Sequence, residues 1–244
     1  MDLVVSKLQH NSGISLVESR ESIVESTNRL IEIAQSVTND EITNAHYIGL
    51  EVALNKDFQS NLLNQIETIK GHEIGILEKA ISSKRGEKRH LTLFRAREDL
   101  NVLEQLRNYP EILRDELIKL GQNLSNGCLK VSGVGSLSFK DKVAYFLVLD
   151  ENTTEQIQNC RRNIVDALER RTGVHLEFEP YSPHITLGFI KNDVHPIAAK
   201  GEKKILDPSL TAQLNIRGID FSALNLSVSA LELPLSNPTL NKKV

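Results

Sequence analysis

The chain contains no tryptophan, one methionine and two cysteines, and aromatic residues make up only 5% of its 244 residues. Cys128 and Cys160 form no C-x-x-C pair and have no histidine at zinc-ligand spacing, so neither a disulfide framework nor a structural zinc site is predicted. This cysteine usage favours a reducing compartment. No apolar run has membrane-spanning length, and the start of the chain is too acidic for a secretory signal. We expect a cytoplasmic protein with no membrane partner; an effector exported without such a signal would have the same composition.

The chain also lacks a basic excess, because its formal net charge is −3. Proteins that grip long nucleic acids usually concentrate positive charge on the face that contacts phosphates. The two small basic clusters, at 83–90 and 160–171, are interpreted as solvated surface. Hydrophobic residues at 40% and charged residues at 25% are ordinary for a globular protein. The composition therefore argues against a partner that is a long duplex.

Segment patterns divide the chain into an N-terminal helical extension, 1–43, and a larger domain, 44–244. In each half of the domain a strand and a helix precede a strand that carries a histidine, so we predict an α+β fold with antiparallel pairing. The expected strands are 47–55, 90–96, two or three within 127–150, a strand–turn–strand over 174–191, and 221–234. The expected helical segments are 58–82, 97–122 with a break near Pro110, and 153–173, capped by Thr153 or Thr154 and ended by Gly173.

Two short matching motifs stand out, HLTL at 90–93 and HITL at 184–187. Side chains alternate between the faces of a strand, so His90 and Thr92 share one face, and His184 and Thr186 share one face. The apolar residues between them point to the other face, into a core. One His-x-Thr is common, whereas two with apolar residues at matching positions are rare by chance. The alternative is two unrelated histidines hydrogen-bonded on sheets or in turns.

Two imidazoles and two hydroxyls suit the cleavage of a phosphodiester. One histidine can remove a proton from the attacking oxygen while the other delivers a proton to the leaving oxygen. Threonine hydroxyls can donate hydrogen bonds to the non-bridging oxygens as charge develops. This chemistry requires no metal and no cofactor.

With these motifs, one in each half, the chain resembles the two-histidine (2H) phosphoesterase superfamily, which includes LigT-like 2′,3′-cyclic phosphodiesterases and 2′-5′ oligoadenylate phosphodiesterases. The resemblance covers roughly residues 46–235. It implies two lobes related by a pseudo-twofold axis, with antiparallel sheets facing a central groove and helices outside. The catalytic positions that it implies are His90, Thr92, His184 and Thr186. Tyr181, and more weakly Tyr47, would stack on a base; ordinary half-buried packing is the alternative for both.

The expected function is therefore a metal-independent phosphodiesterase that cleaves a 2′-linked nucleotide bond, in a 2′-5′ oligoadenylate or a 2′,3′-cyclic phosphate. The near symmetry of the motifs leaves open which histidine is the acid and which the base. The expected ligand is a small nucleotide, a short oligonucleotide or an RNA end, and we expect a monomer. The alternative function is a non-catalytic module that binds a nucleotide or an RNA end in the same groove, as a sensor or scaffold.

Two other features carry less weight. Gly133 and Gly135 form a lone G-x-G that is typical of a hairpin bend rather than of a phosphate-binding loop. His175 alternates with Glu177 and Glu179, which is compatible with metal binding but more typical of a solvated strand face.

Overall fold

The computed structural model describes residues 29–54, 62, 88–139, 142–177, 181–191, 203–207 and 211–222. Most of the expected N-terminal extension, nearly all of the expected helical segment 58–82, and the expected tail strand beyond residue 222 lie outside the described residues. The division into an extension and a domain therefore stays a prediction. Within 29–43, however, Leu30, Ala34 and Ile42 are buried in the core of the protein.

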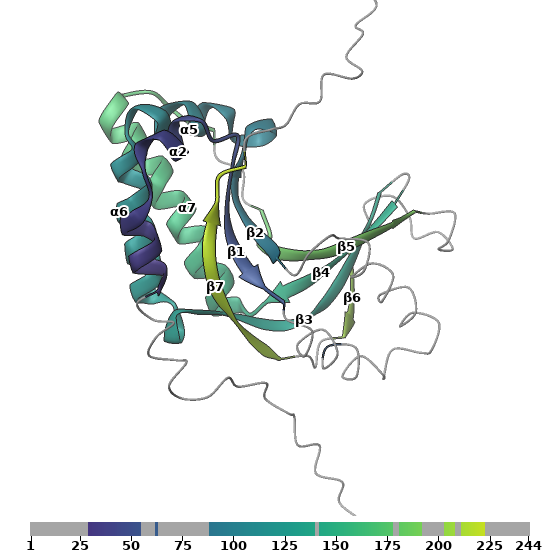
Figure 1. The fold of residues 1–244 in the computed structure, drawn as a ribbon. Helices are drawn as coiled ribbons and strands as arrows, with labels where there is room; N and C mark the ends of the chain where they lie inside the picture. Colours follow the sequence, from purple (N-terminus) through teal and green to yellow (C-terminus); the bar gives the residue numbers. More distant parts are fainter. Residues whose placement is uncertain are drawn as a thin grey trace, which may run out of the picture.

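In the described part of the chain, seven strands form one sheet in the order β4-β5-β2-β1-β7-β3-β6, and every pairing is antiparallel. The long strand β3 pairs with β7 at one end and with β4 along the rest, so six strands form a closed ring. Figure 1 shows β1, β2 and β7 beside the helices and the remaining strands extending away from them. The strands are β1 Tyr47–Ala53, β2 Lys88–Arg95, β3 Cys128–Ser138, β4 Lys142–Leu149, β5 His184–Lys191, β6 Lys203–Asp207 and β7 Ala212–Asp220.

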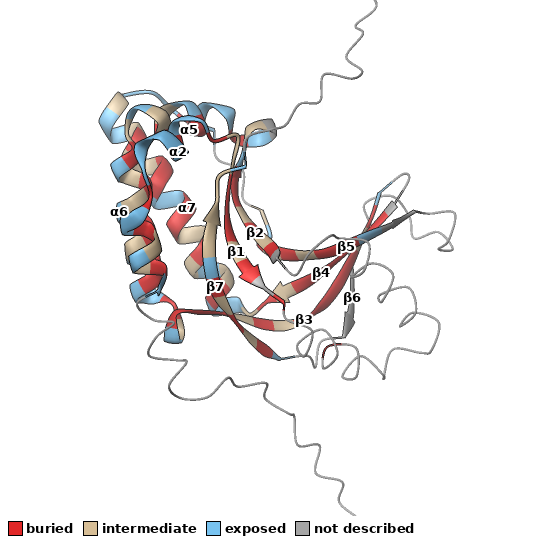
Figure 2. Cartoon of the chain, in the orientation of Figure 1, coloured by how far each residue is buried: buried red, intermediate tan, exposed pale blue. Residues whose placement is uncertain are grey.

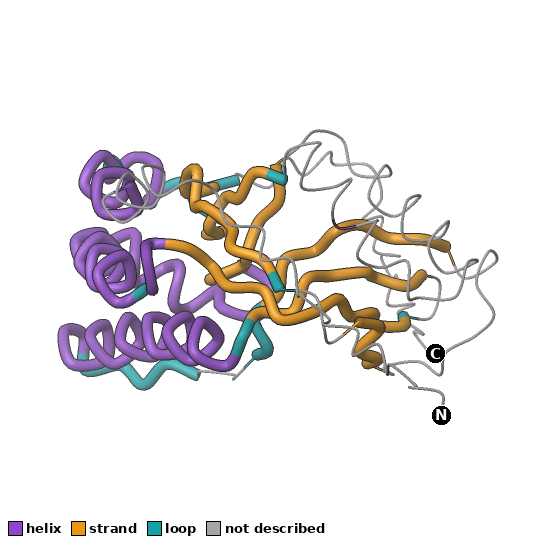
Figure 3. Tube along the Cα trace, turned by 90° about the horizontal axis from the view of Figure 1, so that it is seen from below, coloured by secondary structure: helices purple, strands orange, loops and turns teal. Residues whose placement is uncertain are grey.

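The described helices gather on one side of this sheet, as Figure 3 shows most clearly. Residues 29–36 are helical, and the short helix α2, Asn39–Thr43, begins with a capping box between Thr38 and Glu41. Pro110 opens α6, where its missing N–H leaves no bond unmade, and this explains the predicted break. The longer helices are α5 Ala96–Asn108, α6 Pro110–Asn123 and α7 Glu151–Thr172, and a 3-10 turn, Ser125–Gly127, precedes β3.

The α+β class predicted from the sequence is confirmed, with mixed helices and an antiparallel sheet. The expected division into two lobes is not confirmed. Strands from the two halves of the chain pair directly, β2 with β5 and β7 with β3, within one continuous sheet. The halves therefore share a sheet rather than facing each other as separate sheets.

Alternation along β2 and β5 determines which side chains enter the core (Figure 2). Leu91, Leu93, Ile185 and Leu187 are at most 1% exposed. Full burial of such a side chain contributes about 1.5–3 kcal/mol. A slip of one residue would turn these four side chains away from the core, so burial holds the register. The histidines and threonines between them are thereby kept on the opposite face.

Two local predictions are wrong. Helix α7 is capped by Asp150, whose side chain accepts the Thr153 N–H, and not by either threonine. The hydroxyl of Thr153 instead accepts the N–H of Lys130 in β3. Gly173 ends α7 as predicted, in a left-handed conformation.

The segment 174–177 is not a strand, although its alternation predicted one. Side chains of α7 take its backbone donors: Thr172 Oγ1 accepts the Val174 N–H, and Glu169 Oε1 accepts the Leu176 N–H. His175 Nδ1 lies 2.7 Å from the same Glu169 oxygen. The end of the helix, rather than a neighbouring strand, therefore accepts the backbone hydrogen bonds of this segment.

Both cysteines are free and buried. None of the helices in the described ranges combines the length and apolar character needed to cross a membrane.

Candidate active site

The two His-x-Thr motifs lie on adjacent strands. Strand β2 pairs with β5 through Leu91 and Ile185. His90 and Thr92 flank this pair on β2, and His184 and Thr186 flank it on β5. Because side chains two residues apart share a face of a strand, the two motifs lie next to the same position in the sheet.

Each imidazole also contacts an aromatic ring from the strand on its outer side. The Tyr47 ring of β1 meets His90 edge-on, with ring centroids 6.1 Å apart. The Phe146 ring of β4 lies 5.1 Å from the His184 ring, tilted by 57°. These contacts restrict the rotation of the imidazoles.

Both tyrosines predicted to bind substrate make hydrogen bonds to Thr92. The Tyr47 hydroxyl shares one with Thr92 Oγ1 at 3.1 Å, and the Tyr181 hydroxyl donates one to the Thr92 carbonyl. Burial raises the pKa of both phenols, so both stay protonated at neutral pH. Base stacking by either tyrosine stays a prediction. What the structure adds is that both hold Thr92 in place.

Glycine at position 49 makes the Tyr47 contact possible. Gly49 is the partner of Thr92 in the β1–β2 pairing. A Cβ built on Gly49 would lie 2.5 Å from the Tyr47 hydroxyl oxygen and 2.6 Å from the ring. The phenol therefore crosses the space that any other side chain would fill.

An irregularity in the β1–β2 register supplies another polar group. Ile48 pairs with Phe94, and the next residue, Gly49, pairs with Thr92, so Leu93 has no partner in β1. This bulge shifts the alternation of β2 beyond Thr92. As a result Phe94 turns into the core and Arg95 joins the face that carries the motifs.

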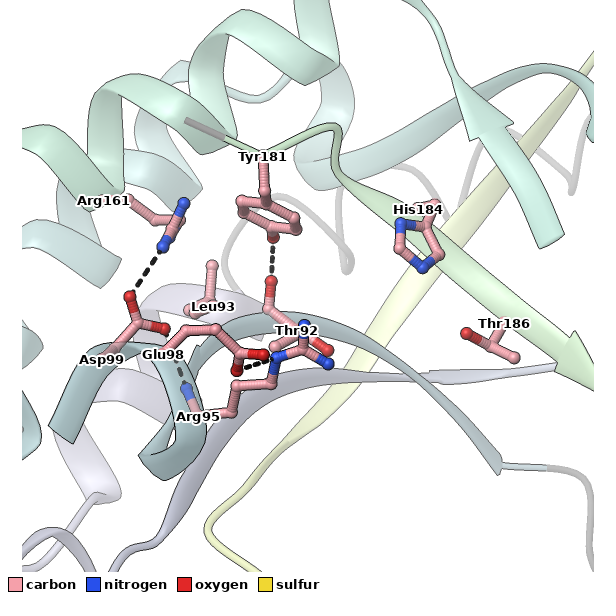
Figure 4. A pocket seen from close by; sticks show the side chains of 9 residues that line it. All are labelled: Thr92, Leu93, Arg95, Glu98, Asp99, Arg161, Tyr181, His184 and Thr186. Carbon is pink, nitrogen blue, oxygen red and sulfur yellow. Dashed lines mark hydrogen bonds and ion pairs between the residues drawn. The ribbon is translucent and has the colours of Figure 1, made fainter. Parts of the chain in front are cut away.

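A pocket of about 200 Å³ opens beside His184 (Figure 4). Thr186 lies at the end near His184, and Tyr181 points toward Thr92 in the middle of the view. His90 is not among the described residues that line it. The full lining is Thr92, Leu93, Arg95, Glu98, Asp99, Arg161, Tyr181, His184 and Thr186.

A buried ion pair forms the inner wall of this pocket. Arg161 Nη2 lies 3.1 Å from Asp99 Oδ1, and both side chains are less than a tenth exposed. The Arg161 guanidinium also covers one face of the Tyr181 ring, 4.3 Å from its centroid. The other Asp99 oxygen accepts the Arg95 N–H at 3.1 Å. Burial raises the pKa of Asp99, opposed by that N–H and by the Arg161 charge.

The two histidines differ in what faces their Nδ1 atoms. His184 Nδ1 lies 2.9 Å from the backbone carbonyl of Ser182. His90 Nδ1 lies 3.2 Å from Asp220 Oδ2 on β7, an ion-pair contact rather than a well-aligned hydrogen bond. Ser222 donates a 2.6 Å hydrogen bond to the other oxygen of Asp220.

A family model described as the Swiss Army Knife, 2H phosphoesterase domain matches residues 52–195, which is more than half of the chain. The chain belongs to the 2H phosphoesterase superfamily. This membership makes it a phosphoesterase of that superfamily. The match spans both motifs, although it does not by itself assign a role to any residue. No curated protein matches the chain.

In this 2H phosphoesterase, sequence reasoning located the motifs and missed several residues around them. Strand β7 was not predicted. Its sequence does carry a signal, because apolar and polar residues alternate from Ala212 to Ile216, and the apolar ones are buried. Asp220 follows on that strand, but nothing in the local sequence indicates its contact with His90. The same holds for Arg161, which reads as one of several charged residues on a helix.

The weaker features do not join this site. His175 pairs with Glu169 after α7, and in the part of the chain that is described no three His, Cys, Asp or Glu side chains cluster as metal ligands would. Gly133 and Gly135 lie within β3, where they pair with β4, and not at the hairpin bend that was expected.

Proposed function

We propose that this 2H phosphoesterase is a phosphodiesterase that hydrolyses a 2′-linked nucleotide bond, in a 2′,3′-cyclic phosphate or a 2′-5′ oligonucleotide. His90 and His184 are its general acid and base, and no metal takes part in the reaction. The observation that carries this proposal is the pairing of Leu91 with Ile185, because it sets the two motifs beside each other in opposite directions.

The arrangement suits a phosphate, because each strand carries one histidine next to the Leu91–Ile185 pair, so a tetrahedral group bound there would be flanked by both rings. All four motif side chains are half-buried, so a substrate can reach them. In-line attack places the entering and leaving oxygens on opposite sides of phosphorus, where each can meet one imidazole.

The threonines supply hydrogen bonds to the remaining oxygens. Thr92 and Thr186 each lie two residues after the histidine of their own strand, and so on the same face of that strand. A hydroxyl held in position before the reaction stabilises developing charge without reorganising. The two tyrosine contacts to Thr92 provide that positioning on one side.

The pocket beside His184 supports a short substrate. A volume of about 200 Å³ is below the ~300–1,000 Å³ typical of sites for drug-sized ligands. Its two arginines, Arg95 and Arg161, are balanced by Glu98 and Asp99. A neutral, small pocket favours one nucleoside over an extended run of phosphates. The proposed substrates are therefore a small nucleotide, a short oligonucleotide or an RNA end, with a 2′-5′ oligonucleotide favoured.

Turnover tests the proposal directly. The protein is incubated with 2′,3′-cyclic AMP and separately with 2′-5′ triadenylate, in excess EDTA, and products are separated by chromatography. We expect product from at least one substrate. We expect His90→Ala and His184→Ala each to lower kcat/KM by about 10²–10⁴-fold, the contribution of a general acid or base.

The matched control is His175→Ala, which removes a histidine whose side chain is 88% exposed and which lies outside the groove. It should retain the wild-type rate. A wild-type rate that collapses in EDTA would contradict the metal-independent mechanism. Tight binding of either nucleotide without turnover would instead favour a sensor or scaffold that uses the same groove.

A further inference from the structure

The two motif histidines contact groups of different charge. His90 contacts a carboxylate: its Nδ1 atom lies 3.2 Å from Asp220 Oδ2. His184 contacts a neutral group: its Nδ1 atom lies 2.9 Å from the backbone carbonyl of Ser182. Both groups are acceptors, so each favours the ring tautomer that carries its proton on Nδ1 and leaves Nε2 free to accept one. Of the two acceptors, only the Asp220 carboxylate carries a full negative charge.

Asp220 is itself held in place. The Ser222 hydroxyl donates to Oδ1, which leaves Oδ2 for His90. The His90 Nδ1 atom is inaccessible to solvent, and the Asp220 side chain is 21% exposed. Water therefore competes little for this nitrogen, and the pairing is stronger than it would be on an open surface.

The contact crosses a whole strand. Asp220 lies on β7 and His90 on β2, with β1 between them, so the two strands are about 9–10 Å apart. Asp220 is paired with Gly49 in β1. The carboxylate therefore reaches the imidazole from two strands away.

The pocket breaks the symmetry of the site. It is bordered by His184, Thr92 and Thr186, and the described lining does not include His90. A nucleoside in this pocket brings its ribose oxygens to the His184 side of the phosphorus. In-line geometry then leaves the opposite side, that of His90, for the attacking water.

We propose that Asp220 is a positioning residue that makes His90 the general base, and that His184 is the general acid. This rests on the proposed function. The Nε2 of neutral His90 accepts a proton from water as the water oxygen bonds to phosphorus. The bond from phosphorus to one ribose oxygen breaks, and protonated His184 gives its Nε2 proton to that oxygen. The products are a phosphate monoester with a free ribose hydroxyl, a protonated His90 and a neutral His184.

Asp220→Asn tests the assignment, with 2′,3′-cyclic AMP or 2′-5′ triadenylate as substrate. The variant keeps the shape and removes the charge. We expect kcat/KM to fall by about 10²-fold, the lower end of what a general base contributes, with Tm unchanged. Asp220→Glu should recover part of the rate, and Asp115→Asn, which removes an exposed charge on α6, should have no effect.

The pH profile separates positioning from a merely structural role. The carboxylate favours the charged form of His90, so without it His90 loses its proton at lower pH. The acidic limb of kcat/KM, which reports the base of the free enzyme, should therefore move to lower pH. Among the described residues, Tyr47 contacts the His90 ring and Glu51 is the partner of His90 in β1, and both are the same in the two proteins. Movement of the alkaline limb, or of neither limb, overturns the proposal.

A second readout does not need turnover. Long-range ¹H–¹⁵N spectra of the histidine rings should show neutral His90 protonated on Nδ1 in the wild type, and titrating at lower pH in Asp220→Asn. A His90 protonated on Nε2, or one that titrates identically in both proteins, refutes the role of Asp220. If the wild type hydrolyses neither nucleotide while the spectra behave as expected, the proposed function fails and the positioning of His90 by Asp220 stands.

Discussion

Replacing Asp99 with asparagine should destabilise the protein strongly and loosen the wall of the pocket. Asp99 and Arg161 form an ion pair whose side chains are 8% and 4% exposed. Burial raises the pKa of Asp99 in spite of the neighbouring guanidinium, so ionising this carboxyl costs more in the folded chain than in the unfolded one. The intact pair is therefore a poor source of net stability, but a lone charge on Arg161 would be worse.

The expected loss of stability follows from this difference between an intact ion pair and a lone buried charge. Removing one partner of a buried ion pair typically costs about 3–5 kcal/mol, because the remaining charge is left without compensation. Against a total stability of about 5–15 kcal/mol, such a loss is a large fraction. Arg161 also covers the ring of Tyr181, whose hydroxyl donates to Thr92. Activity should therefore fall even at temperatures where the variant is still folded.

Chemical denaturation with a full m-value analysis measures the loss. The control is Glu98→Gln, which breaks the ion pair with Arg95, whose side chain is 59% exposed. That change should cost about 0–1 kcal/mol. The double variant Asp99→Asn/Arg161→Met should recover most of the stability, since it leaves no uncompensated charge in the core. A loss below about 1 kcal/mol in Asp99→Asn would refute the reasoning.

Three further predictions concern single positions. Gly49→Ala should lower kcat/KM by about 10²-fold, the size of effect expected when a catalytic group is displaced, because the new Cβ would lie 2.5 Å from the Tyr47 hydroxyl. The control is Gly218→Ala, whose Cβ would meet its nearest neighbour at 3.8 Å, and this variant should keep the wild-type rate. Cys160 should resist iodoacetamide in the folded protein at neutral pH and react after unfolding, since burial raises its pKa to about 12. The pKa of Glu169 is lowered, chiefly by a backbone N–H, from the usual value of 4.5. Its contribution to stability is therefore present above that value and lost as pH falls through the lowered native pKa, so the difference in unfolding free energy between wild type and Glu169→Gln should shrink in acid.

For each of these three predictions, one result would contradict the reasoning. Equal losses in the two glycine variants would show that the strand tolerates no side chain at either position, and that Tyr47 is not the cause. Rapid alkylation of Cys160 without unfolding would mean that the interface of α7 with α6 opens readily. A wild-type advantage over Glu169→Gln that is constant with pH would show that the bond to the N–H of Leu176 does not depend on the charge.

Much of the fold could be predicted from local periodicity. The strands of the two motifs, the break at Pro110 and the end of α7 at Gly173 each have a signal within a few residues, because alternation and backbone preference act over that range. The false strand at 174–177 shows the limit of such signals. Its alternation is real, but side chains of the preceding helix satisfy its backbone, and no neighbouring strand is needed.

By itself the sequence determined that two His-x-Thr pairs lie on strands with their apolar neighbours facing a core, since that follows from the pleat of a strand. Only the tertiary structure decided that β2 pairs with β5, that Asp220 contacts His90, and that Arg161 packs on Tyr181. These contacts join residues far apart along the chain. Strand register and side-chain packing are set by the burial of the whole core, so no short stretch of sequence contains them.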